Sequence, residues 1–200
     1  MVVLNFKKMK TAKYIILISL INSISYFSIA QQIWKPGAVN TKSTTLNCRE
    51  SITGIYVVQR QDYNSKTDLP FGTSDEKGSA SLYINSERIY YNIISKVFTP
   101  ERLKDIETSE KRIIIGFTIN EDGIPIQITY SIKENSKIKP EEIEIIDKLL
   151  KEKIKFKIVR KIPFGEPCVY PFSHILKFEE LKNGEFPLLK RNELEGKKYW

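Results

Sequence analysis

The sequence predicts an α+β domain in which a three-stranded antiparallel sheet packs on a helix. Large apolar residues recur at every second position over Arg112–Ile119 and again over Ile124–Ile132, the period of half-buried strands. The residues between these runs, 120–123, tolerate the left-handed backbone of a short hairpin turn. A helical apolar pattern begins at Pro140, and a third alternating run covers Val169–Phe178. The predicted order is therefore strand, strand, helix, strand.

The first thirty residues are predicted to be a signal peptide that stays outside this fold. They hold four lysines, a mainly apolar run from Tyr14 to Phe27, and the small residues Ser28 and Ala30 at the positions that signal peptidase reads. Cleavage after Ala30 predicts a periplasmic or secreted protein. The alternative is an uncleaved membrane anchor, although the run contains serines and an asparagine and is shorter than the roughly 20 apolar residues of a spanning helix.

The charge of the chain argues against a nucleic-acid-binding protein. The leader contains four lysines and no acidic residue, so its removal lowers the net charge from +8 to +4. The basic runs near Lys148–Lys155 and Lys190–Lys198 are interrupted by glutamates, which is typical of a solvated surface. We therefore expect no nucleic-acid partner, and contact with a membrane only through an uncleaved leader.

The two cysteines, Cys48 and Cys168, both lie after the leader. In an oxidising compartment an even cysteine count favours one disulfide between them, which would close a loop of about 120 residues and add roughly 4 to 5 kcal/mol of stability. Two buried free thiols are the alternative. A redox role is not expected, because catalytic dithiols sit close together as Cys-x-x-Cys.

Residues 31–85 are predicted to be irregular, with one possible strand at residues 54–60. A helical segment precedes the hairpin. Ser86 and Glu87 are suited to starting its first helix, and Thr99 followed by Pro100 ends that helix and begins a short second one that stops near Ile106.

The second half of the chain is predicted to hold the long helix, the third strand and a tail. Pro140 and the carboxylates after it are typical of a helix start, and this helix should lie across the apolar face of the hairpin. Pro171 cannot donate to a ladder, which places the third strand at a sheet edge. Residues 179–200 are charged and are expected to form a tail.

The order of elements and three motifs resemble the C-terminal domain of TonB-type energy transducers. The motifs are the hairpin Ile115–Pro125, the helix end with its basic and aromatic run Leu150–Ile158, and the closing strand Tyr170–Phe178. The resemblance covers roughly residues 86–178 and implies the fold of that family. The chain departs from the family in its cleavable-looking leader, in lacking a long Pro-rich spacer, and in Ile158 where the family tends to have proline.

The resemblance also implies a binding site. In that family the third strand offers an open edge to an extended segment of an outer-membrane transporter. Carried over, the partner-strand edge would comprise Ser173, Ile175 and Lys177, and the partner would be an envelope protein. An edge already covered by residues 54–60 or by the tail is the alternative, and it would make this surface inert.

Enzyme chemistry has little support in the sequence. His174 is the single histidine, and we expect it to be structural, on the strand face shared with Phe172 and Leu176. The common nucleophile, metalloprotease, P-loop and dinucleotide motifs are absent from the sequence, and we expect no cofactor or metal. The predicted function is non-enzymatic binding or structure in the cell envelope. An anchored energy transducer and an enzyme of unrecognised type are the alternatives.

Overall fold

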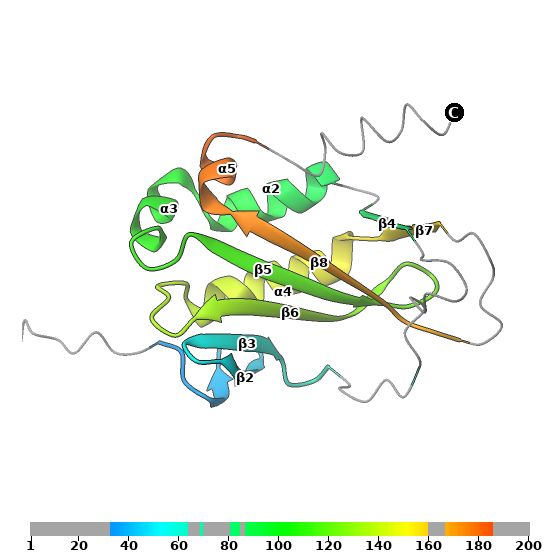
Figure 1. Cartoon of the computed structure of the whole chain (residues 1–200), viewed down its shortest axis with the longest axis horizontal. Coiled ribbons are helices and arrows are strands. Elements are labelled where there is room, and N and C mark those ends of the chain that lie inside the picture. The colour runs from blue at the N-terminus through cyan, green and yellow to red at the C-terminus, as the bar shows by residue number, and fades with distance from the viewer. Residues whose placement is uncertain (1–32, 64–68, 70–80, 85–86, 160–166, 186–200) are drawn as a thin grey trace, which may run out of the picture. The chain divides into compact units, whose positions relative to one another are not determined.

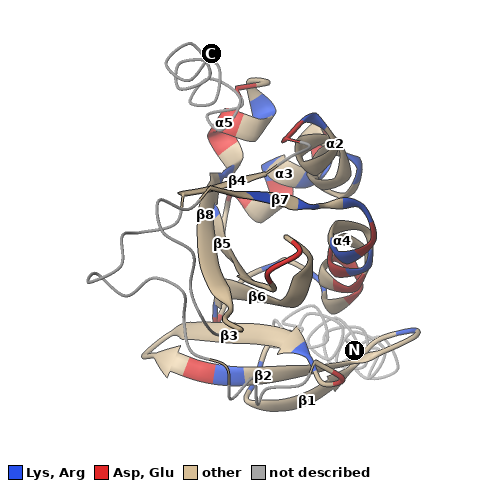
Figure 2. Cartoon of the chain, turned by 90° about the vertical axis from the view of Figure 1, so that its right-hand side faces the viewer, with Lys and Arg blue, Asp and Glu red and all other residues tan. Residues whose placement is uncertain are grey.

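The structure is a computed structural model that describes residues 33–63, 69, 81–84, 87–159 and 167–185. These residues form a mixed α+β fold with antiparallel sheets, which confirms the predicted class (Figure 1). Figure 2 shows the helices on one side of the larger sheet. The predicted signal peptide and the tail beyond residue 185 lie outside the described residues.

The larger sheet has six strands, all paired antiparallel. In spatial order they are β1 (Gly37–Asn40), β2 (Thr45–Ile52), β3 (Ile55–Arg60), β6 (Pro125–Lys133), β5 (Arg112–Ile119) and β8 (Tyr170–Lys177). A smaller sheet pairs β4 (Ser81–Ile84) with β7 (Phe156–Val159). The predicted sheet of three strands is therefore wrong in size, because β1, β2 and β3 extend it beyond β6.

The predicted hairpin is confirmed as β5 and β6. Ile113, Ile115, Phe117 and Ile119 are buried on one face of β5, and the residues between them are more exposed. Gly123 in the turn has φ +76°, the left-handed conformation that glycine adopts without strain. The turn is also fixed from outside, since the amide of Phe156 in β7 donates to the Gly123 carbonyl at 2.8 Å.

The N-terminal region is more regular than predicted. The possible strand at residues 54–60 is confirmed as β3, but β1, β2 and β4 also lie in the region expected to be irregular. In β2 only Leu46 and Cys48 are buried, so the strand has almost no apolar periodicity. Its pairing with β3 supplies backbone hydrogen bonds, which do not depend on apolar side chains.

Three of the four helices in the described residues begin close to where the sequence predicts, and the fourth, at the start of the tail, was not predicted. They are α2 (Glu87–Val97), α3 (Pro100–Ile106), α4 (Pro140–Lys153) and α5 (Phe178–Lys182). The Thr99 hydroxyl accepts a hydrogen bond from the Arg102 amide at 3.3 Å, which confirms it as the cap of α3. Ser86 lies outside the described residues. The predicted tail begins instead with α5, whose Leu181 is buried.

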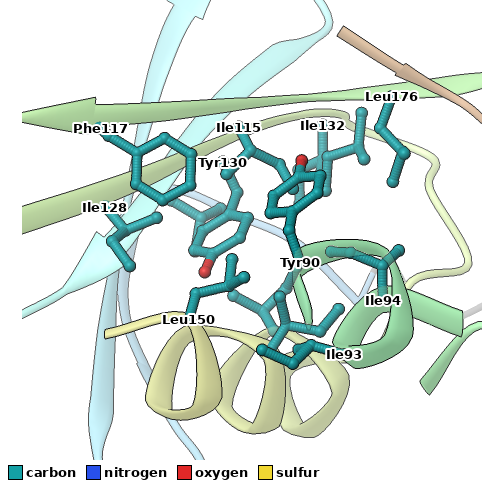
Figure 3. Close-up of a cluster of buried hydrophobic side chains, with 14 of the residues drawn as sticks. Tyr90, Ile93, Ile94, Ile115, Phe117, Ile128, Tyr130, Ile132, Leu150 and Leu176 are labelled. Carbon is teal, nitrogen blue, oxygen red and sulfur yellow. The ribbon is translucent and has the colours of Figure 1, made fainter. Parts of the chain in front are cut away.

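The core lies between the six-stranded sheet and helices α2 and α4 (Figure 3). Tyr130 of β6 and Tyr90 of α2 point into this space, and Leu150 of α4 faces the sheet. Trp34 ties the N-terminal stretch to the same unit. It is fully buried, and its indole Nε1 donates to the Ile138 carbonyl at 2.8 Å.

The predicted disulfide between Cys48 and Cys168 is wrong for this structure, because both are buried free thiols. Cys48 lies on β2, whereas Cys168 lies just before β8, four strands away across the sheet. Neighbouring strands are about 4.8 Å apart, so roughly 19 Å separates the two strands, far beyond the reach of a disulfide. No local pattern in the sequence indicates this separation, because it depends on how β1, β2 and β3 join the sheet.

Candidate functional site

The edge of the six-stranded sheet formed by β8 is the candidate binding site. β8 pairs with β5 on one side only, and no strand among the described residues pairs with its other side. Residues 54–60, which the sequence offered as a possible cover for this edge, pair with β6 instead. Within the described part of the chain, the edge is therefore not occupied by the N-terminal region.

The hydrogen-bond pattern shows which backbone groups of β8 face outward. The amide of Phe178 donates to the Lys111 carbonyl at 3.1 Å, so the backbone N–H and C=O groups of Phe178, and of every second residue before it, point toward β5. Orientation alternates along an antiparallel strand, and the β5–β8 register runs without a shift. Ser173, Ile175 and Lys177 therefore present their N–H and C=O groups to the free edge. The backbone of Pro171 also faces outward, so its missing N–H removes no hydrogen bond to β5.

The predicted edge residues lie together and are accessible. Ser173, Ile175 and Lys177 are all exposed, and Ile175 is 46% exposed although it is apolar. Their side chains point to the face of the sheet opposite the helices, since the alternate residues His174 and Leu176 are buried on the helix side. The structure thus brings together the three residues predicted for a partner strand.

His174 is a buried structural residue, as predicted. Its Nδ1 lies 2.8 Å from the hydroxyl of Tyr90 on α2, and Tyr91 packs edge-on against the ring. Burial lowers the pKa of His174 to about 4, so the imidazole is neutral near pH 7. One tyrosine bond and two aromatic contacts fully explain its position.

Cys168 and His174 do not form a joint site. The Cys168 Sγ lies 3.0 Å from the Tyr170 hydroxyl and 3.7 Å from a carboxylate oxygen of Glu121, near the hairpin turn. His174 lies six positions further along an extended chain, a span of roughly 20 Å. A nucleophile and base acting together would need to be within hydrogen-bond reach.

A buried carboxylate cluster at the end of β3 is the feature that sequence reasoning missed. Asp147 on α4 is fully buried and accepts hydrogen bonds from the hydroxyls of Tyr63 at 2.7 Å and Tyr130 at 3.3 Å. The Arg60 Nε lies 3.9 Å from the same carboxylate. The Lys151 ammonium lies 4.2 Å from the centre of the Tyr63 ring. These contacts join β3, β6 and α4 at one point.

Burial dominates the electrostatics of this cluster. It raises the pKa of Asp147 to about 6, although the Tyr63 hydrogen bond and the Arg60 charge act in the opposite direction. A polar hollow nearby is lined by Arg60, Gln61, Asp62 and residues 43–45, and Asp147 is not among its lining residues. The carboxylate of Asp147 therefore joins β6, α4 and the residues that follow β3.

The sequence did contain a signal for Asp147. The apolar stripe of α4 includes Ile143, Leu150 and Ile154, and Asp147 occupies the position four residues after Ile143 on that stripe. A charged residue on the buried stripe of a helix indicates a partnered buried group. Its partners Tyr63 and Tyr130 are distant in sequence, so only the fold identifies them.

The described residues contain no candidate metal site and no candidate membrane-spanning helix. No group of three or more His, Cys, Asp or Glu side chains in these ranges is arranged to hold a metal ion. None of the helices seen in this part of the chain is long and apolar enough to cross a membrane.

Comparison with known proteins identifies a structural neighbour but no family. No protein-family model matches the sequence, and no curated protein matches it. Among solved structures, a DUF5043 family protein from Bacteroides uniformis is similar with a TM-score of 0.58 and 14% sequence identity. The match covers 74% of this chain and 94% of the other chain. At this identity the likeness shows a shared α+β fold and nothing about activity.

Proposed function

We propose that this chain is an exported, non-enzymatic binding protein of the cell envelope, and that its β8 edge accepts an extended segment of another protein as an additional strand. The observation that carries the proposal is the outer edge of β8, which no strand of the described residues occupies and where Ser173, Ile175 and Lys177 direct their backbone groups away from β5. No cofactor or nucleic acid takes part.

Strand addition suits this edge for a physical reason. Backbone N–H and C=O groups at an edge form hydrogen bonds with any extended chain, so they supply affinity that does not depend on sequence. The side chains of Ser173, Ile175 and Lys177 would lie beside alternate side chains of the added strand and supply selectivity.

We further propose that residues 86–178 form a TonB C-terminal-like domain. The support is the order β5, β6, α4 and β8, with β8 beside β5 and α4 across the hairpin. The other supports are the hairpin and helix-end motifs that resemble the family. Strands β1, β2 and β3 would then be an addition to that fold on the β6 side.

A proline substitution tests the edge. Ser173→Pro removes an outward N–H and leaves the bonds from β8 to β5 in place, whereas Ser173→Ala removes only the side-chain hydroxyl. Peptides selected from a display library with the wild-type chain should bind the proline variant roughly ten-fold or more weakly and the alanine variant nearly unchanged.

Hydrogen exchange provides a second readout for the same peptides. Bound peptide should slow exchange at the amides of Ser173, Ile175 and Lys177, while the amides already bonded to β5 change little. Failure to select any peptide, or selected peptides that bind Ser173→Pro as tightly as wild type, would exclude strand addition. The control is that Ser173→Pro and Ser173→Ala unfold at the same denaturant midpoint, so that a difference in binding does not reflect a difference in stability.

The N-terminus of the protein in its native cells tests export. A mature chain that begins at Gln31 is the expected result, since Ala30 precedes the proposed cleavage site. A full-length chain recovered with the inner membrane would instead indicate an anchored protein of the energy-transducer kind.

A further inference from the structure

The six-stranded sheet has a second face, opposite the helices, whose charged strand residues all have the same sign. We call it the open face and define it by the alternate residues of the described strands whose side chains point away from α2 and α4. Its charged members are all basic, and none of its described strand positions is Asp or Glu. These basic residues are Arg49, Arg112, Lys133 and Lys177.

Three of these cations form one row across the sheet. Arg112 on β5 lies opposite Lys177 on β8, and continuing the β5–β6 register places Lys133 on its other side. Like charges on directly opposed strand positions repel. Lys177 has a carboxylate partner, Glu180, at 2.7 Å. Arg112 and Lys133 make no ion pair within 4 Å of a carboxylate of the described residues, although the buried carboxylate of Glu110 interacts electrostatically with both and accepts a hydrogen bond from the Lys133 amide.

An apolar row lies beside the basic row. Ile175, Ile114 and Val57 occupy β8, β5 and β3 at one level, with Ser131 of β6 between the last two. Ile175 is 46% exposed, and Ile55, next to Lys133 on β3, is 37% exposed. Parallel basic and apolar rows make this end of the open face amphipathic.

We infer that the open face binds an acidic amphipathic helix of another protein. One helical turn advances 5.4 Å, and neighbouring strands are about 4.8 Å apart, so carboxylates at i, i+4 and i+7 match the spacing of Lys177, Arg112 and Lys133. The apolar stripe of such a helix would cover Ile175, Ile114 and Val57. The helix would place carboxylates beside Lys177, Arg112 and Lys133 and so reduce the repulsion among these three cations.

The shape and composition of the face favour a protein helix over a bilayer or a nucleic acid. Neighbouring strands turn by roughly 20–25°, and the turn accumulates over six strands, so this face is saddle-shaped and meets a flat membrane only in part. The strand positions that define the open face include no aromatic side chain, and stacking on aromatic side chains is a main source of affinity for single-stranded nucleic acids.

Charge reversal with a matched control tests the inference. The probe is an amphipathic peptide of about 18 residues with glutamates at i, i+4 and i+7 beside a leucine stripe. We expect the Arg112→Glu/Lys133→Glu variant to bind it roughly ten-fold or more weakly than wild type. The control, Lys148→Glu/Lys153→Glu, makes the same change in net charge at exposed positions of α4 and should bind it like wild type.

Further binding measurements distinguish a protein helix from other ligands of the open face. A peptide with lysines in place of the glutamates should prefer the Arg112→Glu/Lys133→Glu variant. Equal weakening by both double variants, or binding of wild type to phosphatidylglycerol vesicles but not to the peptide, would overturn the inference. Ser173→Pro should bind the helical peptide normally, so this result and the result for strand addition at β8 can fail separately.

Discussion

Asp147 on α4 is fully buried, and its pKa differs between the folded and the unfolded chain. Its pKa in the folded chain is about 6, against an ordinary value of 3.8 in the unfolded chain. Between these values the folded state binds more protons than the unfolded state, so this carboxyl adds stability as the pH falls. At neutral pH the buried charge costs stability, and the hydrogen bonds of Tyr63 and Tyr130 offset part of that cost.

An Asp147→Asn variant should reveal this contribution. We expect the free energy of unfolding of wild type, minus that of the variant, to increase by roughly 2 kcal/mol between pH 7 and pH 4. Urea unfolding at pH 7, 6, 5 and 4 measures the difference. A difference that stays constant over this range would show that the Asp147 pKa is not raised.

His174 should act in the opposite direction over nearly the same pH range. Its pKa falls from 6.5 to about 4 on folding, so the stability that the neutral ring contributes is present above pH 6.5 and is lost as the pH falls toward 4. We expect the difference between wild type and His174→Gln to decrease by roughly 3 kcal/mol between pH 7 and pH 4. The same urea series tests it, and an increase would contradict the assignment of a buried neutral ring.

At the scale of elements, the hairpin turn between β5 and β6 offers a controlled comparison. Gly123 and Gly54 both have φ +76°. A Cβ at Gly123 would lie 2.0 Å from the Phe156 carbonyl oxygen, whereas a Cβ at Gly54 would meet nothing within 4 Å. The two sites therefore share the conformational cost of alanine and differ in the clash with β7.

We expect Gly54→Ala to lower the free energy of unfolding by about 1 kcal/mol and Gly123→Ala by roughly 3 kcal/mol or more. Denaturant unfolding of the two variants measures both values. Equal losses would mean that β7 does not hold the turn as closely as the 2.8 Å bond from Phe156 to Gly123 indicates.

The elements also show what the sequence can and cannot reveal. β5, β6 and α4 were predictable because their apolar residues recur at the strand and helix periods and because Gly123 and Pro140 mark their boundaries. β2 was not, since most of its side chains are polar or exposed and its stability comes from pairing with β3. The edge at β8 was predictable from Pro171, but the partners of Asp147 were not, because 84 residues separate it from Tyr63.

At the scale of the whole molecule, residues 33–63 are an integral part of the folded unit. Trp34 is fully buried against the stretch before α4, and Arg60 and Tyr63 reach Asp147 on that helix. Three separate contacts therefore couple the N-terminal strands to the predicted domain. This coupling predicts one cooperative unfolding transition for the whole described unit.

Trp34→Ala tests that coupling. The variant should lose roughly 3 to 5 kcal/mol of unfolding free energy, as expected for removing a fully buried tryptophan. The helical circular dichroism signal and the hydrogen exchange of β8 amides should shift together, although β8 is far from Trp34 in the sequence. Unchanged exchange at β8 would mean that the N-terminal strands unfold on their own.

Pro171 limits how many residues of an added strand can pair with the β8 edge. Pro171 has no N–H and offers only its C=O, so Ser173 is the first outward-facing residue of β8 that can both donate and accept a hydrogen bond, and the strand ends at Lys177, where α5 begins. The part of the β8 edge that can pair with another strand is thus only a few residues long and has a fixed limit at each end. A strand held by so few hydrogen bonds would bind in one register and dissociate quickly. Fast dissociation suits repeated binding and release better than permanent assembly.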